Sequence, residues 1–456
     1  MLFTTQWLNA IFSNNRGVAS ATIGIQEVTT DSRKKTTGSL FVPLIGDNFD
    51  GHDHVLQAIN HGAVAIIWNQ NKQLPDFLPI DFPIYLVEDT LEALQLLATQ
   101  YRQEINPIVV GITGSNGKTT TKDLVAAIVK TTYKTHFTHG NFNNHIGLPL
   151  TILGMARETE VLILEMGMSD YKEIEQLSEI AIPDYAIITN IGESHIEFLG
   201  SREGITKAKL EIVCGMKENG LLIIDGDEAL LESIDNHKNV VTCGFLSSNN
   251  VIIEQIEISH AKTTFSLLDA STYAIPLLGR HNAQNAAYAI ILGQQLKISN
   301  EDIKKGLLSL ELTGMRFELL KGTNDVSIVN DAYNASPTSM KAAIDVIKQM
   351  KGFKEKVLVL GDIFELGEQS EALHRSVADV IEPPITAVFT YGNIALNISA
   401  AVREKQVNIV CNHFGSKEAL LNKLEQYCTT DTLILFKASR GMQFEKLVEA
   451  MQEGSK

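Results

Sequence analysis

The sequence predicts an α/β protein of three consecutive α/β domains, and three observations lead to this fold class. The chain has 456 residues, more than one hydrophobic core normally serves, so about three domains is the expected number. Hydrophobic residues make up 44% of it, which is enough to fill several cores. Short runs of Ile, Val and Leu alternate with helical patterns, which is typical of parallel sheets covered by helices on both faces.

The predicted domains are residues 1–105, 106–312 and 313–456. In the first, apolar runs predict strands, helical spacing predicts helices, and a polar stretch predicts a linker to the second domain. The strands are expected at 39–44 and 63–68, the helices at 54–61 and 90–102, and the linker at 103–107.

The second domain begins with an apolar run at 108–113 that predicts a buried strand. Further runs predict a parallel sheet, and the more alternating stretch 251–275 predicts an antiparallel extension. The third domain is predicted to be Rossmann-like, with strands separated by helices. The other predicted strands are 161–164, 185–189 and 221–224 in the second domain and 327–330, 357–360, 387–390 and 432–436 in the third.

Charge and composition exclude several classes of partner. The formal net charge of -16 makes nucleic acids and anionic membranes poor partners, since both attract basic surfaces. Four widely spaced cysteines without a Cys-x-x-Cys pair argue against a zinc site or a disulfide framework. The first residues lack the pattern of a signal peptide, and no apolar run reaches the roughly 18 residues of a membrane span. We therefore expect a cytoplasmic monomer, without membrane insertion, that acts on small molecules.

A glycine-rich loop, Gly111–Thr120, follows the first strand of the second domain and precedes a helical run at 122–130. Its backbone N–H groups and the positive end of the helix suit phosphate oxygens. Lys118 is expected to reach the β- and γ-phosphates of ATP, and the Thr119 hydroxyl to bind Mg²⁺. A plain strand-to-helix turn is the alternative. The residues expected at the nucleotide are Gly114, Ser115, Asn116, Gly117, Lys118, Thr119 and Thr120.

Glu165 and His195 each follow a predicted strand of the same parallel sheet. Both are therefore expected at its carboxyl edge, where ligands bind in open α/β sheets. Carboxylate and imidazole groups can hold Mg²⁺ beside the phosphates. The alternatives are a helix-capping carboxylate for Glu165 and a surface histidine for His195.

The phosphate loop departs from the strict Walker spacing, which would require glycine at the position of Ile112. In this respect Thr113–Thr120 resembles the loop of the Mur ligases and folylpolyglutamate synthetases. Further segments resemble the same family along the whole chain, and 330–337 is the most diagnostic of them. They are Asp31–Arg33, Gly38–His52, Gly140–Asn144, Glu165–Gly167, Asn190–His195, Gly279–Asn282, Gly314–Glu318, Asn330–Pro337, Leu360–Asp362 and Lys437–Arg440.

The resemblance implies an ATP-dependent ligase that joins D-alanyl-D-alanine to a UDP-N-acetylmuramoyl tripeptide through an acyl phosphate, in peptidoglycan precursor synthesis. Two alternatives stay open. One is another amide ligase of the family, adding a single amino acid or extending folate with glutamate. The other is a P-loop ATPase switch, in which Val161–Glu165 would be the Walker B strand. The segments Asp31–Arg33 and Asp331–Pro337 favour the ligase that adds D-alanyl-D-alanine over the other amide ligases of the family.

The family also implies two Mg²⁺ ions and a lysine carbamylated by CO₂. Lys209, in a helix predicted at 206–216, matches that lysine. Lys207 lies two residues away and hence on a different face of the helix. Carbamylation requires a neutral amine, so the site must lower the lysine pKa; the alternative is an ordinary solvated lysine. The expected metal ligands are Thr119, Glu165, His195 and carbamylated Lys209.

By the same resemblance, Asn282 lies near the adenine, Arg316 contacts the phosphates and Asp331 binds the ribose. Without it they would be a helix N-cap, a surface ion pair and a turn aspartate. Substrate-binding residues are expected in all three domains, with the UDP end in the first and the dipeptide in the third; alone, they are ordinary loop residues. They are Ser32, Arg33, Gly46, Asp47, Asn141, Asn143, Asn144, Asn334 and Arg440.

Overall fold

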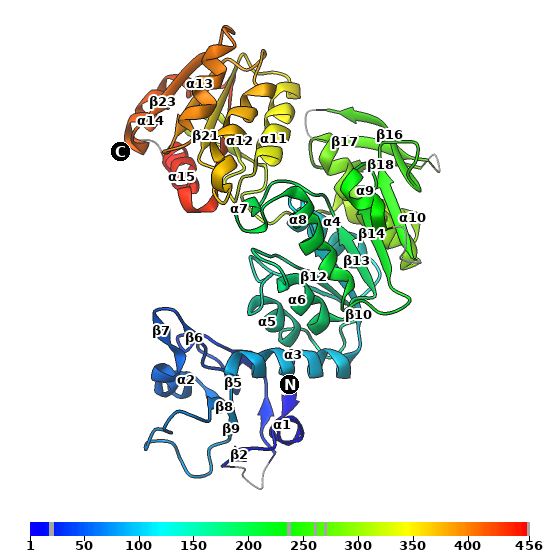
Figure 1. Ribbon diagram of the computed structural model, residues 1–456, viewed down its shortest axis with the longest axis vertical. Coiled ribbons are helices and arrows are strands. Elements are labelled where there is room, and N and C mark those ends of the chain that lie inside the picture. The colour runs from blue at the N-terminus through cyan, green and yellow to red at the C-terminus, as the bar shows by residue number, and fades with distance from the viewer. Residues whose placement is uncertain (18–21, 235–238, 260–261, 269–270, 454–456) are drawn as a thin grey trace.

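The structure, a computed structural model, describes residues 1–17, 22–234, 239–259, 262–268 and 271–453. Three α/β units follow one another along the long axis in the order of the chain (Figure 1). Each large sheet lies within one of the ranges 1–105, 106–312 and 313–456, and we propose these ranges as the domains. Among the described helices, none is both long and apolar enough to cross a lipid bilayer.

The first unit contains a five-stranded sheet. Its order is β2 (Asn15–Arg16), β9 (Ile84–Val87), β8 (Ala63–Asn69), β5 (Ser39–Phe41) and β4 (Glu27–Thr29). All neighbours pair in parallel except β2 and β9. The two predicted strands are confirmed, although β5 ends before Pro43, which has no N–H to donate. Smaller elements are β1 (Phe3–Thr4), α1 (Thr5–Ile11), β3 (Gly24–Ile25), β6 (Ile45–Gly46), β7 (Phe49–Asp50), η1 (Gly51–His54) and α2 (Val55–Asn60).

The linker predicted at 103–107 is wrong, because helix α3 (Thr90–Ile105) continues through most of it. Asp89 caps the helix at its start, and Asn106 ends it in the left-handed conformation at φ 50°. Arg102 is buried and donates a 2.9 Å hydrogen bond to the Ile182 carbonyl of the second unit. These contacts hold the last turn of α3 against the next unit, so the two are joined by a rigid helix.

The second unit is built on a nine-stranded sheet. Its order is β11 (Thr135–Phe137), β12 (Val161–Glu165), β10 (Ile108–Thr113), β13 (Tyr185–Ile188), β14 (Leu221–Asp225), β15 (Val240–Gly244), β16 (Val251–Ile258), β17 (Thr263–Leu267) and β18 (Thr272–Ile275). Strands β11 to β16 pair in parallel. Strands β16 to β18 pair antiparallel, so the predicted extension is confirmed.

Two of the predicted helices of this unit have different starts. The helix after the phosphate loop begins at Lys118 rather than Lys122, because Gly117 ends the loop in the left-handed conformation. The helix predicted at 206–216 begins at Arg202, after the cap residue Ser201, and ends at Leu210. The helical elements are α4 (Lys118–Val129), α5 (Gly147–Leu153), α6 (Glu173–Ala181), α7 (Ile196–Leu199), α8 (Arg202–Leu210), η2 (Glu211–Val213), η3 (Ala229–Ile234), α9 (Arg280–Gln295) and α10 (Asn300–Leu308).

The third unit contains a six-stranded sheet. Its order is β19 (Glu318–Lys321), β20 (Ser327–Asn330), β24 (Thr432–Lys437), β21 (Glu355–Gly361), β22 (Ala387–Tyr391) and β23 (Val410–Phe414). All pairs are parallel except β19 with β20. The main helices are α11 (Pro337–Gln349), α12 (Ser370–Val377), α13 (Leu396–Glu404), α14 (Lys417–Leu424) and α15 (Glu445–Glu453). The start of α11 faces the second unit, and Ser336 caps it.

Candidate active site

The glycine-rich loop connects β10 to α4 and has the backbone shape of a phosphate loop. Gly114 has φ 147°, and a Cβ there would lie 1.9 Å from the Thr189 hydroxyl. Gly117 has φ 79°, and a Cβ there would lie 2.7 Å from the Asn285 amide oxygen. Both positions therefore require glycine, since another residue would be strained and would clash.

Asn190, two residues after the neighbouring strand β13, holds this loop. Its backbone carbonyl accepts from the Ser115 N–H at 3.0 Å. Its side-chain oxygen accepts from the Asn116 N–H at 3.0 Å, and its amide nitrogen donates to the Asn116 carbonyl at 2.9 Å. These three hydrogen bonds fix the backbone of the loop at Ser115 and Asn116. The side-chain nitrogen of Asn116, Nδ2, is buried and has no hydrogen-bond partner within the described part of the chain.

Lys118, the first residue of α4, lies above the same loop. Its ammonium donates to the Gly114 carbonyl at 2.8 Å, so it is held at the position where phosphates would contact the loop. Burial lowers the pKa of Lys118, while the nearby Glu165 opposes that shift.

Glu165 ends β12 and is buried. One carboxylate oxygen accepts from the Thr119 hydroxyl at 2.8 Å, and the other accepts from the Asn143 amide at 2.8 Å. A carboxylate and a hydroxyl oxygen in contact, beside a phosphate loop, form a donor set that suits Mg²⁺. A role for Glu165 as a helix cap is excluded, because its partners are side chains from other elements.

His195 lies in the loop between β13 and α7, with φ 65°. Its Nδ1 atom is 2.5 Å from the Glu365 carboxylate, which belongs to the third unit. This close contact with His195 lowers the pKa of Glu365. Sequence reasoning missed Glu365, since no motif connects residues so far apart in the chain.

Lys209 lies on α8 with its side chain turned inward. It is 1% exposed, and its amine has no hydrogen-bond or ion-pair partner among the described residues. Burial lowers its pKa well below the usual value, and the charge of Lys118 adds to the shift. Lys207 is exposed and lies over the Tyr171 ring. The predicted difference between the two helix faces is therefore confirmed.

Arg316 and Asp331, which were both predicted to bind the nucleotide, lie at the same site as the phosphate loop. Arg316 donates to the Thr119 hydroxyl at 3.1 Å, and its guanidinium carbon is 4.0 Å from the centre of the Tyr333 ring. The Arg316 Nε atom is buried without a partner in the described part of the chain. Asp331 forms a 2.6 Å ion pair with Lys437. The unmatched Arg316 donor suits an anionic ligand.

Asn282 lies inside the first turn of α9, so an N-cap role is wrong; Gly279 occupies that position. Its amide nitrogen donates to the Leu278 carbonyl at 2.8 Å, and its oxygen accepts from Asn285 at 3.2 Å. These bonds fix the orientation of the amide at the cavity wall.

A cavity of about 510 Å³ brings these groups together between the second and third units. The described residues contain no cluster of three or more His, Cys, Asp and Glu side chains suited to a metal, so any metal would also need hydroxyl, water or phosphate oxygens. The predicted residues that line the cavity are Ser115, Asn116, Gly117, Lys118, Thr119, Thr120, Asn141, Asn143, Asn144, Glu165, His195, Lys209, Asn282, Arg316, Asp331, Asn334 and Arg440.

Family profiles match almost the whole length of the chain. Residues 24–102 match the Mur ligase family catalytic domain, 112–293 the Mur ligase middle domain, and 315–440 the glutamate ligase domain of the Mur ligases. The chain belongs to the Mur ligase family.

Individual Mur ligases are similar over their full lengths. The UDP-N-acetylmuramoyl-tripeptide–D-alanyl-D-alanine ligase of Bacillus subtilis (strain 168) is 47% identical over 431 residues, which are 94% of this chain and 93% of that protein. A crystal structure of MurF from Acinetobacter baumannii has a TM-score of 0.87 at 30% identity and covers 99% of both chains. MurF ligase from Thermotoga maritima, in complex with ADP, has a TM-score of 0.83 at 28% identity and covers 94% of this chain and 97% of that one.

The amino-terminal residues predicted to bind the UDP end of a Mur ligase substrate lie outside the cavity. The Ser32 hydroxyl donates to Gln57 at 2.8 Å. Arg33 is 80% exposed and pairs with Asp31 at 2.8 Å, which lowers the Asp31 pKa to about 2. Gly46 and Asp47 lie at the turn between β6 and β7. The structure therefore does not bring these four residues to the nucleotide site.

Proposed function

We propose that this chain is the ATP-dependent ligase that joins D-alanyl-D-alanine to UDP-N-acetylmuramoyl tripeptide, forming the pentapeptide precursor of peptidoglycan. The observation that carries the proposal is the single cavity where a phosphate loop, a buried carboxylate and the unpartnered amine of Lys209 meet Arg316 of the third unit. The similarity over nearly the full length to a ligase named for this reaction supports it. We expect a cytoplasmic monomer.

The proposed reaction has two steps. In the first, an oxygen of the tripeptide carboxylate attacks the γ-phosphorus of ATP, ADP leaves, and an acyl phosphate forms. In the second, the D-alanyl-D-alanine amine attacks the acyl carbon, the carbon–oxygen bond to phosphate breaks, and the amine loses a proton. Activation is required because a carboxylate is a poor electrophile at neutral pH.

Lys118 and Arg316 are proposed to stabilise the transferring phosphoryl group, since positive charge held in place before the reaction lowers its barrier. Lys118 comes from the phosphate loop and Arg316 from the third unit, so both act together only when the two units are docked. Asn143 holds the Glu165 carboxylate at 2.8 Å and limits its rotation.

Thr119, Glu165 and His195 are proposed to hold Mg²⁺. When bound, the metal neutralises charge on the phosphate oxygens. A second ion is proposed to require Lys209: its neutral amine attacks CO₂, the new nitrogen–carbon bond forms, and a proton is lost, leaving a carbamate anion. The burial of Lys209, its lowered pKa and the absence of a partner in the described part of the chain support this proposal, because all three favour a neutral amine.

Phosphate release with one substrate omitted at a time tests the proposed function. With ATP, UDP-N-acetylmuramoyl tripeptide and D-alanyl-D-alanine together, phosphate should accumulate with one pentapeptide per phosphate. Omission of either small substrate should stop continuous release. Release that continues without them indicates an ATPase switch, and release supported instead by a single amino acid or by a folate indicates another amide ligase.

A further inference from the structure

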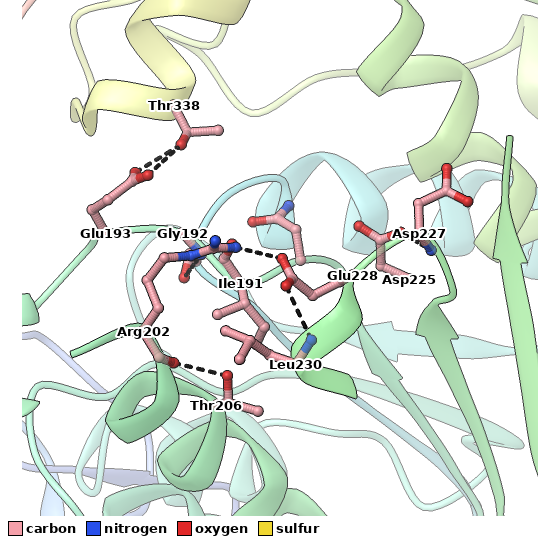
Figure 2. A network of polar contacts seen from close by, with 12 residues as sticks. Ile191, Gly192, Glu193, Arg202, Thr206, Asp225, Asp227, Glu228, Leu230 and Thr338 are labelled. Carbon is pink, nitrogen blue, oxygen red and sulfur yellow. Dashed lines mark hydrogen bonds and ion pairs between the residues drawn. The ribbon is translucent and has the colours of Figure 1, made fainter. Parts of the chain in front are cut away.

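A network of polar contacts centres on Arg202, the first residue of α8 (Figure 2). The Arg202 guanidinium donates to the Ile191 carbonyl at 3.0 Å and lies 2.5 Å from the Glu228 carboxylate. Glu228 also accepts from the Leu230 N–H at 3.2 Å. Arg202 thus links the segment after β14 to the loop 191–195, which we call the bridging loop.

The bridging loop contacts both the phosphate loop and the third unit. On one side the Gly192 N–H donates to the Ser115 hydroxyl of the phosphate loop at 2.8 Å. On the other side the Thr338 hydroxyl of the third unit donates to the Glu193 carboxylate, at 2.7 and 3.0 Å to its two oxygens (Figure 2). The loop ends at His195. Its conformation therefore decides at once how it meets the phosphate loop and how it meets α11.

We propose that Arg202 is a positioning residue for the ligation reaction: it holds the bridging loop in the conformation that joins the phosphate loop to the docked third unit. This inference rests on the proposed function. Arg202 lies seven residues, about two helical turns, before Lys209 on the same helix. By holding the Ile191 carbonyl, Arg202 fixes the position of the bridging loop, which carries His195, relative to helix α8, which carries Lys209.

The chemistry of arginine suits this task. Its planar guanidinium presents several donors in fixed directions, so one side chain serves the Ile191 carbonyl and the Glu228 carboxylate together. Glu228 is only 13% exposed, whereas Arg202 is 44% exposed. The carboxylate is thus the fixed partner that orients the guanidinium. Because solvent reaches the Arg202 side of this ion pair, the pair contributes little to global stability, so its loss should act locally on the loop.

Hydrogen exchange of the ligand-free protein tests the proposal without any substrate. Arg202→Ala should accelerate exchange at Gly192 and at Glu197, whose N–H donates to the Glu365 carbonyl at 3.2 Å. Exchange at Thr189, which follows β13 and whose N–H donates to the Thr113 carbonyl at 2.9 Å, should stay unchanged. Arg375→Ala is the matched control, since Arg375 on α12 also pairs with a glutamate, Glu404, and is 36% exposed. Unchanged exchange at Gly192 in Arg202→Ala would overturn the proposal.

Kinetics then separate positioning from stability. Arg202→Ala should lower kcat about tenfold or more with little change in the KM for ATP, because a small misplacement of reacting groups costs up to about 10²-fold. Arg202→Lys should recover part of this loss, and Arg375→Ala should show none. Wild-type kcat in Arg202→Ala, or the same loss in Arg375→Ala, would contradict a positioning role. If the wild type does not ligate, the proposed function fails while the exchange result remains interpretable.

Thr338→Val tests the outer contact of the bridging loop, since it removes the hydroxyl and keeps the shape. It should lower kcat without changing exchange at Gly192, because the Ser115 contact remains. Accelerated exchange at Gly192 in Thr338→Val would show that docking of the third unit, rather than Arg202, holds the loop, and would overturn the proposal.

Discussion

The nucleotide cavity and the amino-terminal loops were both predicted as binding regions, yet they differ in how their side chains are held. In the cavity, Glu165 is buried and bonded to residues from two other elements. In the first unit, Arg33 is exposed and paired only with Asp31, two residues away. A site formed where several strands end is held in place by the fold, whereas a site on surface loops is ordered mainly by its ligand. Substitutions in the cavity should therefore affect turnover, and those in the loops should affect binding.

Lys118→Ala should have the largest effect among the residues proposed to contact the phosphates. It removes the charge held above the phosphate loop, and loss of one such group typically lowers kcat by about 10²–10³-fold. Steady-state phosphate release with all three substrates measures it. Lys130→Ala is a control at the opposite end of α4, where the Lys130 ammonium lies over the Phe137 ring. Turnover within a fewfold of the wild type would remove Lys118 from the proposed mechanism.

Arg316→Ala should follow, with a loss of about 10²-fold in kcat, because it removes a charged donor supplied by the third unit. Arg316→Lys should restore little, since a lysine cannot keep both the Thr119 contact and the stacking on Tyr333. Comparison of single-turnover rates with ATP affinity checks the assignment. A variant that binds ATP weakly but turns over normally at saturation would show that Arg316 only binds the nucleotide.

Replacement of Lys209 should have opposite effects on activity and on the stability of the fold. Lys209→Met should abolish ligation that high bicarbonate cannot restore, while Lys207→Ala should remain active. Near-normal turnover in Lys209→Met would count against carbamylation.

The same substitution should stabilise the fold in CO₂-free buffer. The folded-state pKa of Lys209 is lowered, so between that pKa and the ordinary value of 10.5 the unfolded chain binds more protons. The unfolding free energy of the wild type should therefore rise with pH, by up to about 1.4 kcal/mol per pH unit. Lys209→Met should remove this contribution and be more stable at neutral pH. Urea unfolding across pH 7–10 measures it, and identical slopes would contradict an unpartnered buried amine.

Arg33→Ala should have the smallest effect. If the amino-terminal loops bind the UDP end, the KM for the tripeptide substrate should rise about tenfold, the loss expected from one charge-assisted contact, with kcat unchanged. The melting temperature should stay close to that of the wild type, because exposed ion pairs contribute only about 0–1 kcal/mol. An unchanged KM would show that the UDP group binds elsewhere.

The sequence by itself determined the fold class, the parallel central sheet and the phosphate loop, because buried strands and glycine spacing leave local signals. Glu165 and His195 could be predicted as neighbours, since both follow strands whose carboxyl ends meet at one edge. The continuous helix α3 could not be predicted, because the polar residues at its end become helical only through contacts such as that of Arg102 with the second unit.

Only the tertiary structure decided how the site is completed. The pairing of His195 with Glu365, the contact of Arg316 with Thr119 and the link from Arg202 to the bridging loop join residues far apart in the chain or on different elements. A residue's type is visible in the sequence, but its burial and its partners depend on how sheets and helices pack. Lys209 shows the difference. It is the same residue type as Lys207, and only its inward position lowers its pKa and leaves its amine without a partner among the described residues.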